Sequence, residues 1–248
     1  MSVARVLVCA AIGGLACALA PRVVYRLSVH YGEPPRAACG DCGAAFPAGL
    51  RGWVRLSGRC PRCGRRLGPP GWLTALAGAV SCGALAWAVG SRPLVLAAFL
   101  VVAVCGVFLA AIDLTCLRLP DVLVAGGGTV ALGLLGAAAF AGGELAPLVR
   151  ALAGAATLGA VYLVLALVPG ARLGFGDVKL AAVLGLLLGW VGWGAVLLGA
   201  LFPHLINGPV VVGLLLTGRA DRRTDLPLGP ALLGGALAAI VVAAALAR

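Results

Sequence analysis

Charged residues are scarce in this chain of 248 residues: they make up 11% of it, and only eight are Asp or Glu. Soluble domains carry about 25% charged residues, so the composition excludes an ordinary water-soluble protein. Aromatic residues are also few, at 6%, whereas apolar residues make up 62%. The two histidines, His30 and His204, have no partners at ligand spacing, so no histidine-based metal site is indicated.

Long apolar runs dominate the chain instead. About 20 apolar residues cross a bilayer core, and we predict an all-α polytopic membrane protein with about eight transmembrane helices. The expected spans are 3–20, 72–90, 94–112, 122–141, 146–168, 178–190, 194–217 and 228–247. The run from residue 178 is short, so it is either tilted or continuous with a re-entrant turn at 192–194. Pro203 and Pro209, which flank His204 and Asn207, predict a broken helix in the seventh span.

The net charge of +11 indicates membrane topology rather than nucleic-acid binding, because Arg and Lys gather in alternate loops. Of the 19 Lys and Arg residues, 15 fall on one side of the predicted membrane. The other four are Arg5, Arg92, Arg150 and Arg248. The positive side is therefore predicted to be cytoplasmic, with the N-terminus outside. The alternative is a secretory signal peptide ending near residues 18–20, whose cleavage would export the whole basic loop.

Four cysteines form a pair of CxxC motifs with a 17-residue spacer: Cys39, Cys42, Cys60 and Cys63. This spacing is typical of a tetrathiolate zinc site, and four protein ligands make it structural rather than catalytic. A redox dithiol and a pair of disulfides are the alternatives, and a cytoplasmic location argues against both. The remaining cysteines lie in or beside apolar runs, where small buried side chains are expected: Cys9, Cys17, Cys82, Cys105 and Cys116.

Two acidic residues stand out because each sits where an apolar run meets a loop on the cytoplasmic side: Asp113 and Asp177. Carboxylates there are costly and indicate function. Two adjacent carboxyl groups share a proton, so that one activates water while the other donates a hydrogen bond to a scissile carbonyl. Gly174 and Gly176 allow the backbone to approach a substrate closely. The alternative for Asp177 is simple capping of the following helix.

Four segments resemble, in order, the motifs of the type IV prepilin peptidase family: 111–113, 119–121, 174–179 and 226–230. The CxxC loop after the first span is also similar to that family. The resemblance implies a GxGD aspartic endopeptidase of the bacterial inner membrane that cleaves the basic leader of prepilins or pseudopilins at the cytoplasmic face. Family roles then make Asp113 and Asp177 the catalytic residues.

The resemblance also implies three parts: a first transmembrane helix (1–20), a cytoplasmic tetracysteine zinc loop (21–71) and a transmembrane aspartic peptidase core (72–248). Motif residues expected to support the catalytic pair are Gly174, Gly176, Lys179 and Asp121. Asp121 either bonds within its loop or caps the next span. Lys179 either tunes Asp177 or anchors its helix at the interface.

Many members of this family also methylate the new N-terminus of the pilin with S-adenosylmethionine. Such members carry an Asn-Ile-Pro-type segment between the cysteine pairs and an acidic residue soon after the second pair. Residues 44–53 lack the first feature, and residues 64–75 contain no Asp or Glu. An acidic side chain would hold the cationic sulfonium or the substrate amine, so the residues leave this second activity and its cofactor open.

Two other classes of protein share parts of the pattern. A presenilin-like intramembrane protease also uses GxGD, but no zinc loop is expected in it. A non-enzymatic zinc-ribbon transporter or assembly protein would explain the apolar runs and the cysteines, but not the two carboxylates at one face. The expected partners are prepilin or pseudopilin substrates and membrane lipid, with no nucleic acid.

Overall fold

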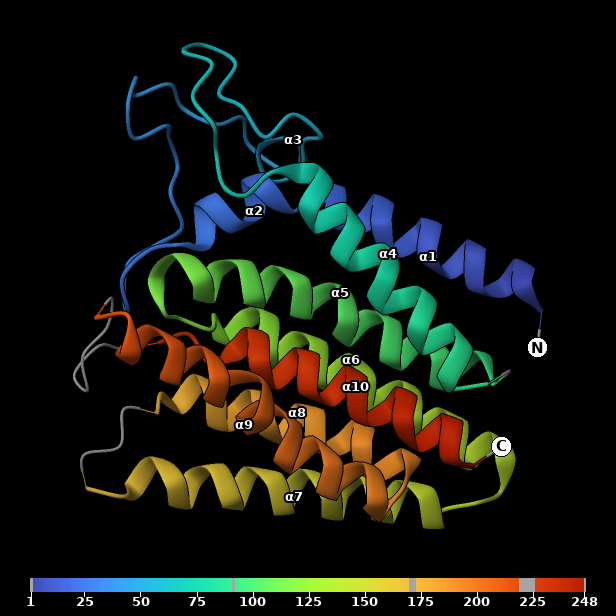
Figure 1. Cartoon of the computed structure of the whole chain (residues 1–248). Helices are drawn as coiled ribbons and strands as arrows, with labels where there is room; N and C mark the ends of the chain where they lie inside the picture. The colour runs from blue at the N-terminus through green and yellow to red at the C-terminus, as the bar shows by residue number, and fades with distance from the viewer. Residues whose placement is uncertain (1, 91, 170–172, 219–225, 248) are drawn as a thin grey trace.

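The structure is a computed structural model that describes residues 2–90, 92–169, 173–218 and 226–247. Each of the eight predicted spans coincides with a helix to within a few residues (Figure 1). The helices are α1 (Val3–Ala18), α2 (Ala20–Leu27), α3 (Leu50–Trp53), α4 (Gly71–Ala88), α5 (Pro93–Cys116), α6 (Asp121–Gly142), α7 (Ala146–Leu167), α8 (Phe175–Val191), α9 (Trp193–Leu216) and α10 (Gly229–Leu246). The described residues contain isolated β-bridges but no strand. The all-α prediction is therefore confirmed.

Among the described residues, six helices are long and apolar enough to cross a membrane: α4, α5, α6, α7, α9 and α10. The bent pair α1 and α2 adds a seventh candidate. Helix α8 has 17 residues and is the short run that the sequence predicted. Gly192 ends it with a φ of 155°, and α9 begins at the next residue. A multi-pass membrane protein follows from these lengths.

The first span differs from its predicted end at residue 20. The chain bends by 45° between α1 and α2 and stays helical to Leu27. Pro21 falls in the first turn of α2, where its missing N–H and fixed φ are tolerated. Ala20 and Val24 are fully buried, so the helix continues because its apolar face has a partner. The polar loop thus begins one helical segment later than expected.

Helix α9 also differs from expectation, because it runs through Pro203 and Pro209 as one helix. Pro203 lies against Gly235 of α10: a Cβ on that glycine would come within 2.7 Å of the Pro203 nitrogen. Pro203 has no backbone N–H and so removes one hydrogen bond from α9, and the close packing of α10 against it supports the helix at this point. The ring of His204 stacks on Tyr162 of α7, with centroids 6.1 Å apart, so packing accounts for this histidine.

Glycines set the closest helix contacts. A Cβ on Gly154 of α7 would lie 2.9 Å from the Cα of Gly189 in α8. Small residues at such crossings let transmembrane helices approach until their backbones touch. Arg150 of α7 also donates from Nε to the Gly189 carbonyl at 2.8 Å and from Nη2 to the Trp190 carbonyl at 2.8 Å. These contacts hold the C-terminal end of α8 against α7.

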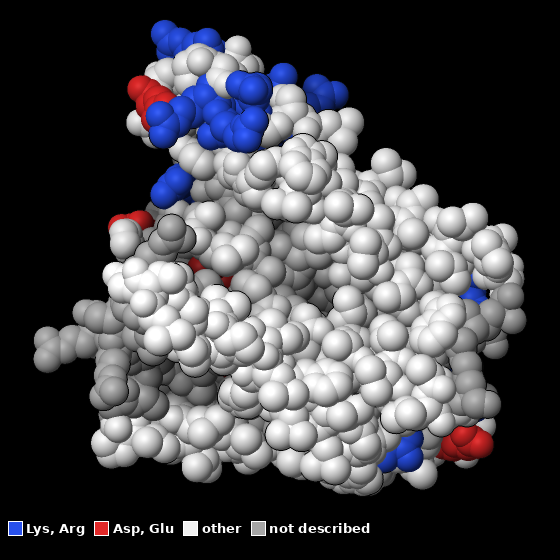
Figure 2. Space-filling model, viewed as in Figure 1, with Lys and Arg blue, Asp and Glu red and all other residues white. Residues whose placement is uncertain are grey.

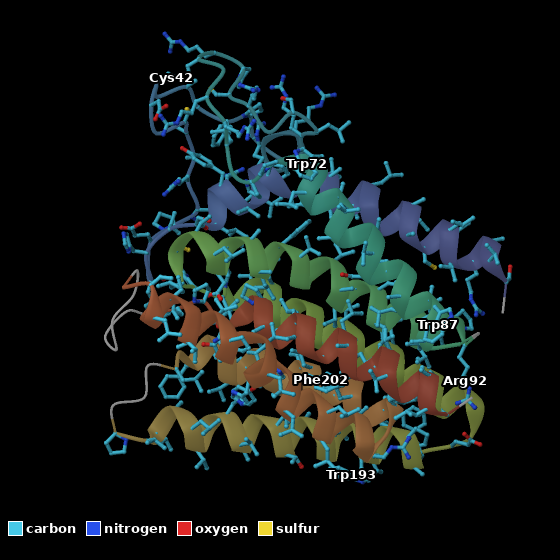
Figure 3. The ribbon with its side chains drawn as sticks, in the orientation of Figure 1. Cys42, Trp72, Trp87, Arg92, Trp193 and Phe202 are labelled. Carbon is cyan, nitrogen blue, oxygen red and sulfur yellow. The ribbon has the colours of Figure 1, made fainter. Side chains whose placement is uncertain are left out.

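The two ends of the helix bundle differ in charge. Lys and Arg gather on the tetracysteine loop above α2 and α4 (Figure 2). The opposite end carries the loose pair of Arg92 with Glu144, 3.7 Å apart. Trp72 lies near the loop, whereas Trp87 and Trp193 lie toward the other end (Figure 3). Tryptophan is enriched at both membrane–water interfaces, so this placement fits a bundle that spans the bilayer.

Candidate active site

Asp113 lies in the last turn of α5 and is 5% exposed. The sequence placed it at the junction with a loop, but the helix continues for three more residues to Cys116. Leu117 then ends α5 with a left-handed φ of 52°, and its N–H donates to the Asp113 carbonyl at 2.9 Å. The helix end therefore fixes the backbone of Asp113 directly, because this bond closes its final turn.

The carboxylate of Asp113 is held from a distant part of the chain. Its Oδ2 accepts the backbone N–H of Gly229 at 2.9 Å, just where α10 begins. A Cβ on Gly229 would lie 2.8 Å from that oxygen. The sequence singled out segment 226–230 as a motif without giving it a role. In the structure, the motif brings the start of α10 into contact with Asp113.

Asp177 is the third residue of α8. Its Oδ2 accepts the Gly174 N–H at 3.2 Å, and its own N–H donates to the Gly174 carbonyl at 3.0 Å. Asp177 therefore does cap the start of α8, which was the alternative role suggested by the sequence. This hydrogen bond uses only its Oδ2 atom. Burial, followed by the charge of Asp113, raises the pKa of Asp177 to about 6, against an opposing effect of the Gly174 N–H.

Both aspartates line one cavity of about 470 Å³ where α5, α6 and α8 meet. Its lining contains all six residues expected from the sequence to form or support the catalytic pair: Asp113, Asp121, Gly174, Gly176, Asp177 and Lys179. The remaining lining residues are Tyr31, Leu117, Arg118, Leu119 and Phe175. The cavity therefore joins the last turn of α5 to the first turn of α8. The predicted convergence on one site is thus present in the fold.

Lys179 and Asp121 make a contact with each other that none of the alternatives from the sequence described. Lys179 Nζ lies 2.8 Å from Asp121 Oδ1, and this ion pair links the second turn of α8 to the first residue of α6. Lys179 is therefore a bridge between helices. Gly176 lies against Leu119, where a Cβ would come 3.0 Å from the leucine Cβ. A side chain at Gly176 would press on the loop between α5 and α6.

Arg118 and Tyr31 are site residues that the sequence did not identify. Arg118 Nη1 donates to the carbonyls of Val29 at 2.9 Å and His30 at 2.7 Å. Its guanidinium also lies 5.5 Å from the centroid of the Tyr31 ring. Arg118 thereby attaches the segment after α2 to the rim of the cavity. The sequence did contain a signal for Arg118, because it lies between Asp113 and Asp121. The topology prediction, however, used Arg118 only as a positive charge.

The four CxxC cysteines converge in the loop above α2. Their sulfur atoms all lie within 4.8 Å of one another, with 3.8 Å between Cys39 and Cys63 and 3.6 Å between Cys42 and Cys60. A tetrahedral zinc with bonds of about 2.3 Å needs sulfur separations of about 3.8 Å. All four thiols are free, so no disulfide joins them. The donor set and its spacing fit one tetrahedral metal ion.

Each CxxC segment forms the same turn. The N–H of Gly43 donates to the Cys39 carbonyl at 3.0 Å, and the N–H of Gly64 donates to the Cys60 carbonyl at 3.0 Å. Both glycines have positive φ, 68° and 71°, which a side chain would disfavour. Antiparallel bridges flank the turns, at residues 38 and 45 and at residues 59 and 66. The two halves therefore present their sulfurs symmetrically.

Arginines of α2 fasten this loop to the helix bundle. Arg22 is 1% exposed; its Nη1 donates to the Arg51 carbonyl at 3.4 Å, and its guanidinium lies 5.0 Å from the Phe46 ring centroid. The guanidinium of Arg26 lies 3.8 Å from the ring centroid of Trp53. Cation–π contacts of this kind are worth about 0.5–2 kcal/mol each. Two charges counted for topology thus also hold the loop in place.

The comparisons with known proteins agree with this arrangement. Residues 100–247 match the model of the type IV leader peptidase family. The chain is 35% identical over 224 residues to a protein of Burkholderia pseudomallei (strain K96243) named prepilin leader peptidase/N-methyltransferase, covering 83% of this chain and 67% of the relative. Proteins of the same name from Aeromonas hydrophila (31% over 203 residues) and Pseudomonas aeruginosa (32% over 209 residues) cover 79% of this chain and 68% of each relative. No solved structure gives a significant match.

The family model covers both aspartates, both motif glycines and the segment at the start of α10. The match runs through the helices that build the cavity. It therefore sets aside the presenilin-like protease and the non-enzymatic transporter or assembly protein. The chain belongs to the type IV leader peptidase family.

Proposed function

We propose that this protein is a membrane aspartic peptidase that removes the basic leader of prepilins or pseudopilins, with Asp113 and Asp177 as its catalytic pair. The observation that carries the proposal is the shared cavity, which both carboxylates line at the charged end of the bundle. The relatives' printed name supplies the substrate class.

Asp177, whose pKa is raised to about 6, is the partner that holds the shared proton at mildly acidic pH. Asp113, oriented by the Gly229 N–H, then takes a proton from water, and the water oxygen attacks the scissile carbonyl carbon. Asp177 donates its proton to the carbonyl oxygen. When the tetrahedral intermediate collapses, Asp113 passes its proton to the leaving nitrogen, Asp177 takes a proton back from a hydroxyl of the intermediate, and the C–N bond breaks. One water is consumed, and a carboxyl and an amine are formed.

The membrane orientation belongs to the same proposal. The cavity, the tetracysteine loop and Arg118 lie at the end of the bundle where Lys and Arg gather, and the positive-inside rule assigns that end to the cytoplasm. Arg172, Arg219, Arg222 and Arg223, which entered the charge count, lie outside the described residues. The protein is accordingly proposed to reside in the bacterial inner membrane with its N-terminus outside.

The tetracysteine cluster is proposed to hold one structural zinc. The small loop has only a minor buried cluster of its own, made by Cys39, Cys60 and Leu67. Metal binding supplies folding free energy in domains of this kind. With four thiolates as ligands, the ion has no open position for water, so its contribution is to stabilise the loop. Hydrolysis is assigned to the carboxyl pair.

A second activity, methyl transfer from S-adenosylmethionine to the new amine, is favoured by one observation besides the relatives' name. Glu33 lines a cavity of about 450 Å³ together with Tyr25 and Arg36, under the loop and beside Thr115 of α5. The sequence offered no acidic residue after the second cysteine pair, and Glu33 supplies one from the segment before the first. The readout is the ratio of methylated to unmethylated N-termini in cleaved substrate. Glu33→Gln should lower this ratio, and Glu144→Gln, at the other end of the bundle, should leave it unchanged.

Cleavage of a candidate prepilin in proteoliposomes tests the main proposal. Asp113→Asn and Asp177→Asn should each reduce the rate by at least about 1,000-fold, because neither carboxyl can replace the other. Glu144→Gln is the matched control, since it makes the same chemical change far from the cavity. Substantial cleavage by either aspartate variant, inserted and folded, would overturn the assignment.

A further inference from the structure

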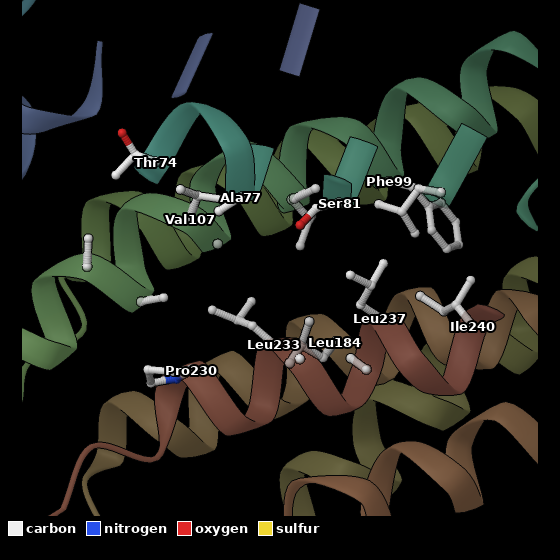
Figure 4. A pocket seen from close by; sticks show the side chains of 18 of the residues that line it. Thr74, Ala77, Ser81, Phe99, Val107, Leu184, Pro230, Leu233, Leu237 and Ile240 are labelled. Atoms are coloured by element: carbon white, nitrogen blue, oxygen red, sulfur yellow. The ribbon is translucent and has the colours of Figure 1, made fainter. Parts of the chain in front are cut away.

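A second cavity, of about 290 Å³, lies between α4, α5 and α10 and reaches α8 at its floor. Figure 4 shows side chains of α4 and α5 facing Leu233, Leu237 and Ile240 of α10 across the open space. In the space-filling view, the surface is hollowed between the positions of α4 and α10 (Figure 2). The only side-chain polar groups among its lining residues are the hydroxyls of Thr74 and Ser81. We call this cavity the α4/α5/α10 groove.

One end of the groove lies next to the residues that hold Asp113. At one end its lining includes Ala110 and Leu114, which flank Asp113 in α5, and Pro230, which follows Gly229. Along α10 the lining continues to Ile240, a distance of about 15 Å at 1.5 Å per residue. The groove therefore begins within one residue of both Asp113 and Gly229, which are joined by the hydrogen bond at the catalytic cavity.

We propose that the α4/α5/α10 groove binds the apolar segment of the substrate on the membrane side of the cleaved bond. This inference rests on the proposed function. The lining carries no charge that would pair with a basic leader, and a segment entering the bilayer beside α5 must be apolar. A lipid acyl chain is the competing occupant. The closeness of one end of the groove to Asp113 favours the substrate, because a lipid acyl chain need not lie beside the carboxyl pair.

The lining offers positions where the groove can be filled. A Cβ on Gly234 of α10 would meet only the Cδ1 of Ile206, at 3.9 Å, so a side chain fits there. Ala77 lies on the opposite wall, in α4. Gly133 of α6 is an exposed glycine whose Cβ would meet nothing within 4 Å. Gly234→Leu and Ala77→Leu therefore test the groove, and Gly133→Leu is the matched control for adding a leucine to a helix.

The experiment uses the full chain in proteoliposomes and two substrates with the same leader and cleavage site. The long substrate keeps its apolar segment, and the short one is cut a few residues beyond the scissile bond. Filling the groove should lower kcat/KM for the long substrate about tenfold relative to the short one, as expected for loss of one buried apolar contact. Gly133→Leu should leave the ratio of the two values at that of the wild type.

If a filled variant does not fold, a photo-crosslinking amino acid at Ala77 replaces it and should capture the long substrate, whereas the same group at Gly133 should not. An unchanged ratio in folded groove variants overturns the inference, as does crosslinking at Ala77 to phospholipid alone. Failure of the wild type to cleave either substrate is a distinct result. It removes the proposed function, and the inference with it.

Discussion

The backbone N–H of Gly229 donates to Oδ2 of Asp113 at 2.9 Å, across 116 positions of the chain. The bond joins the start of α10 to the last turn of α5, so the orientation of one carboxylate depends on how the final helix packs. A main-chain donor holds this oxygen without adding a titratable group. The glycine is required for space, because a Cβ would come 2.8 Å from the same oxygen.

Gly229→Ala should therefore reduce cleavage while leaving the protein inserted. The added methyl group displaces the Asp113 carboxylate, and a misplacement of about 1 Å costs on the order of 100-fold in rate. Cleavage kinetics with a prepilin substrate measure the loss. Gly136→Ala is the control, since a Cβ there meets nothing within 4 Å. Wild-type kinetics in Gly229→Ala would show that this hydrogen bond does not position the catalytic carboxylate.

The pH dependence should follow Asp177, whose pKa burial and the Asp113 charge raise from 3.8 to about 6. In the proposed mechanism cleavage requires a singly protonated pair, so kcat/KM should fall as pH rises through about 6. The raised pKa also means that the folded state favours the protonated form. The stabilising contribution is complete below about pH 4 and is lost as pH rises through about 6.

Thermal unfolding in detergent separates these two effects. Wild-type Tm should decline between pH 4 and pH 7 more than the Tm of Asp177→Asn, because the amide cannot titrate. If Tm depends on pH in the same way in both proteins, the titrating group is not Asp177.

Metal analysis should find one zinc per chain. Cys39→Ser or Cys60→Ser should remove the ion and expose the loop to protease, while α4 to α10 stay folded, because the loop has its own small buried cluster. Limited proteolysis with mass spectrometry measures both parts. Brief exposure to a chelator should leave most cleavage activity. Absence of metal from protein purified without chelator contradicts the first expectation. Rapid loss of activity with an intact fold, restored by zinc, would instead indicate a metallopeptidase.

Single-cysteine labelling should place Gly58 and Leu117 on the cytoplasmic side, in a chain whose native cysteines have been replaced. Both residues lie at the charged end, Gly58 in the tetracysteine loop and Leu117 at the rim of the catalytic cavity. The variant Glu144→Cys, at the opposite end, should be labelled from the outside. Arg172 carries the same cytoplasmic prediction but lies outside the described residues. Labelling of the Gly58→Cys variant from the outside would show that the protein has the opposite orientation in the membrane.

The amino-acid sequence determined the class of this protein and its chemistry. Apolar runs in a bilayer must form helices, because lipid offers no hydrogen-bond partner to the backbone. All eight predicted runs are helices in the structure. CxxC spacing predicts a metal cluster because each turn brings its own two sulfurs together. The paired aspartates could be selected because carboxylates are so few in the chain.

The tertiary structure alone decided the contacts between distant segments. No local pattern shows that Gly229 donates to Asp113, that Lys179 pairs with Asp121, or that Arg118 attaches the segment after α2. Such bonds depend on which helices become neighbours, and that choice comes from close packing at glycines such as Gly154. The groove beside α10 likewise exists only once three helices have packed, because a cavity is a property of their arrangement.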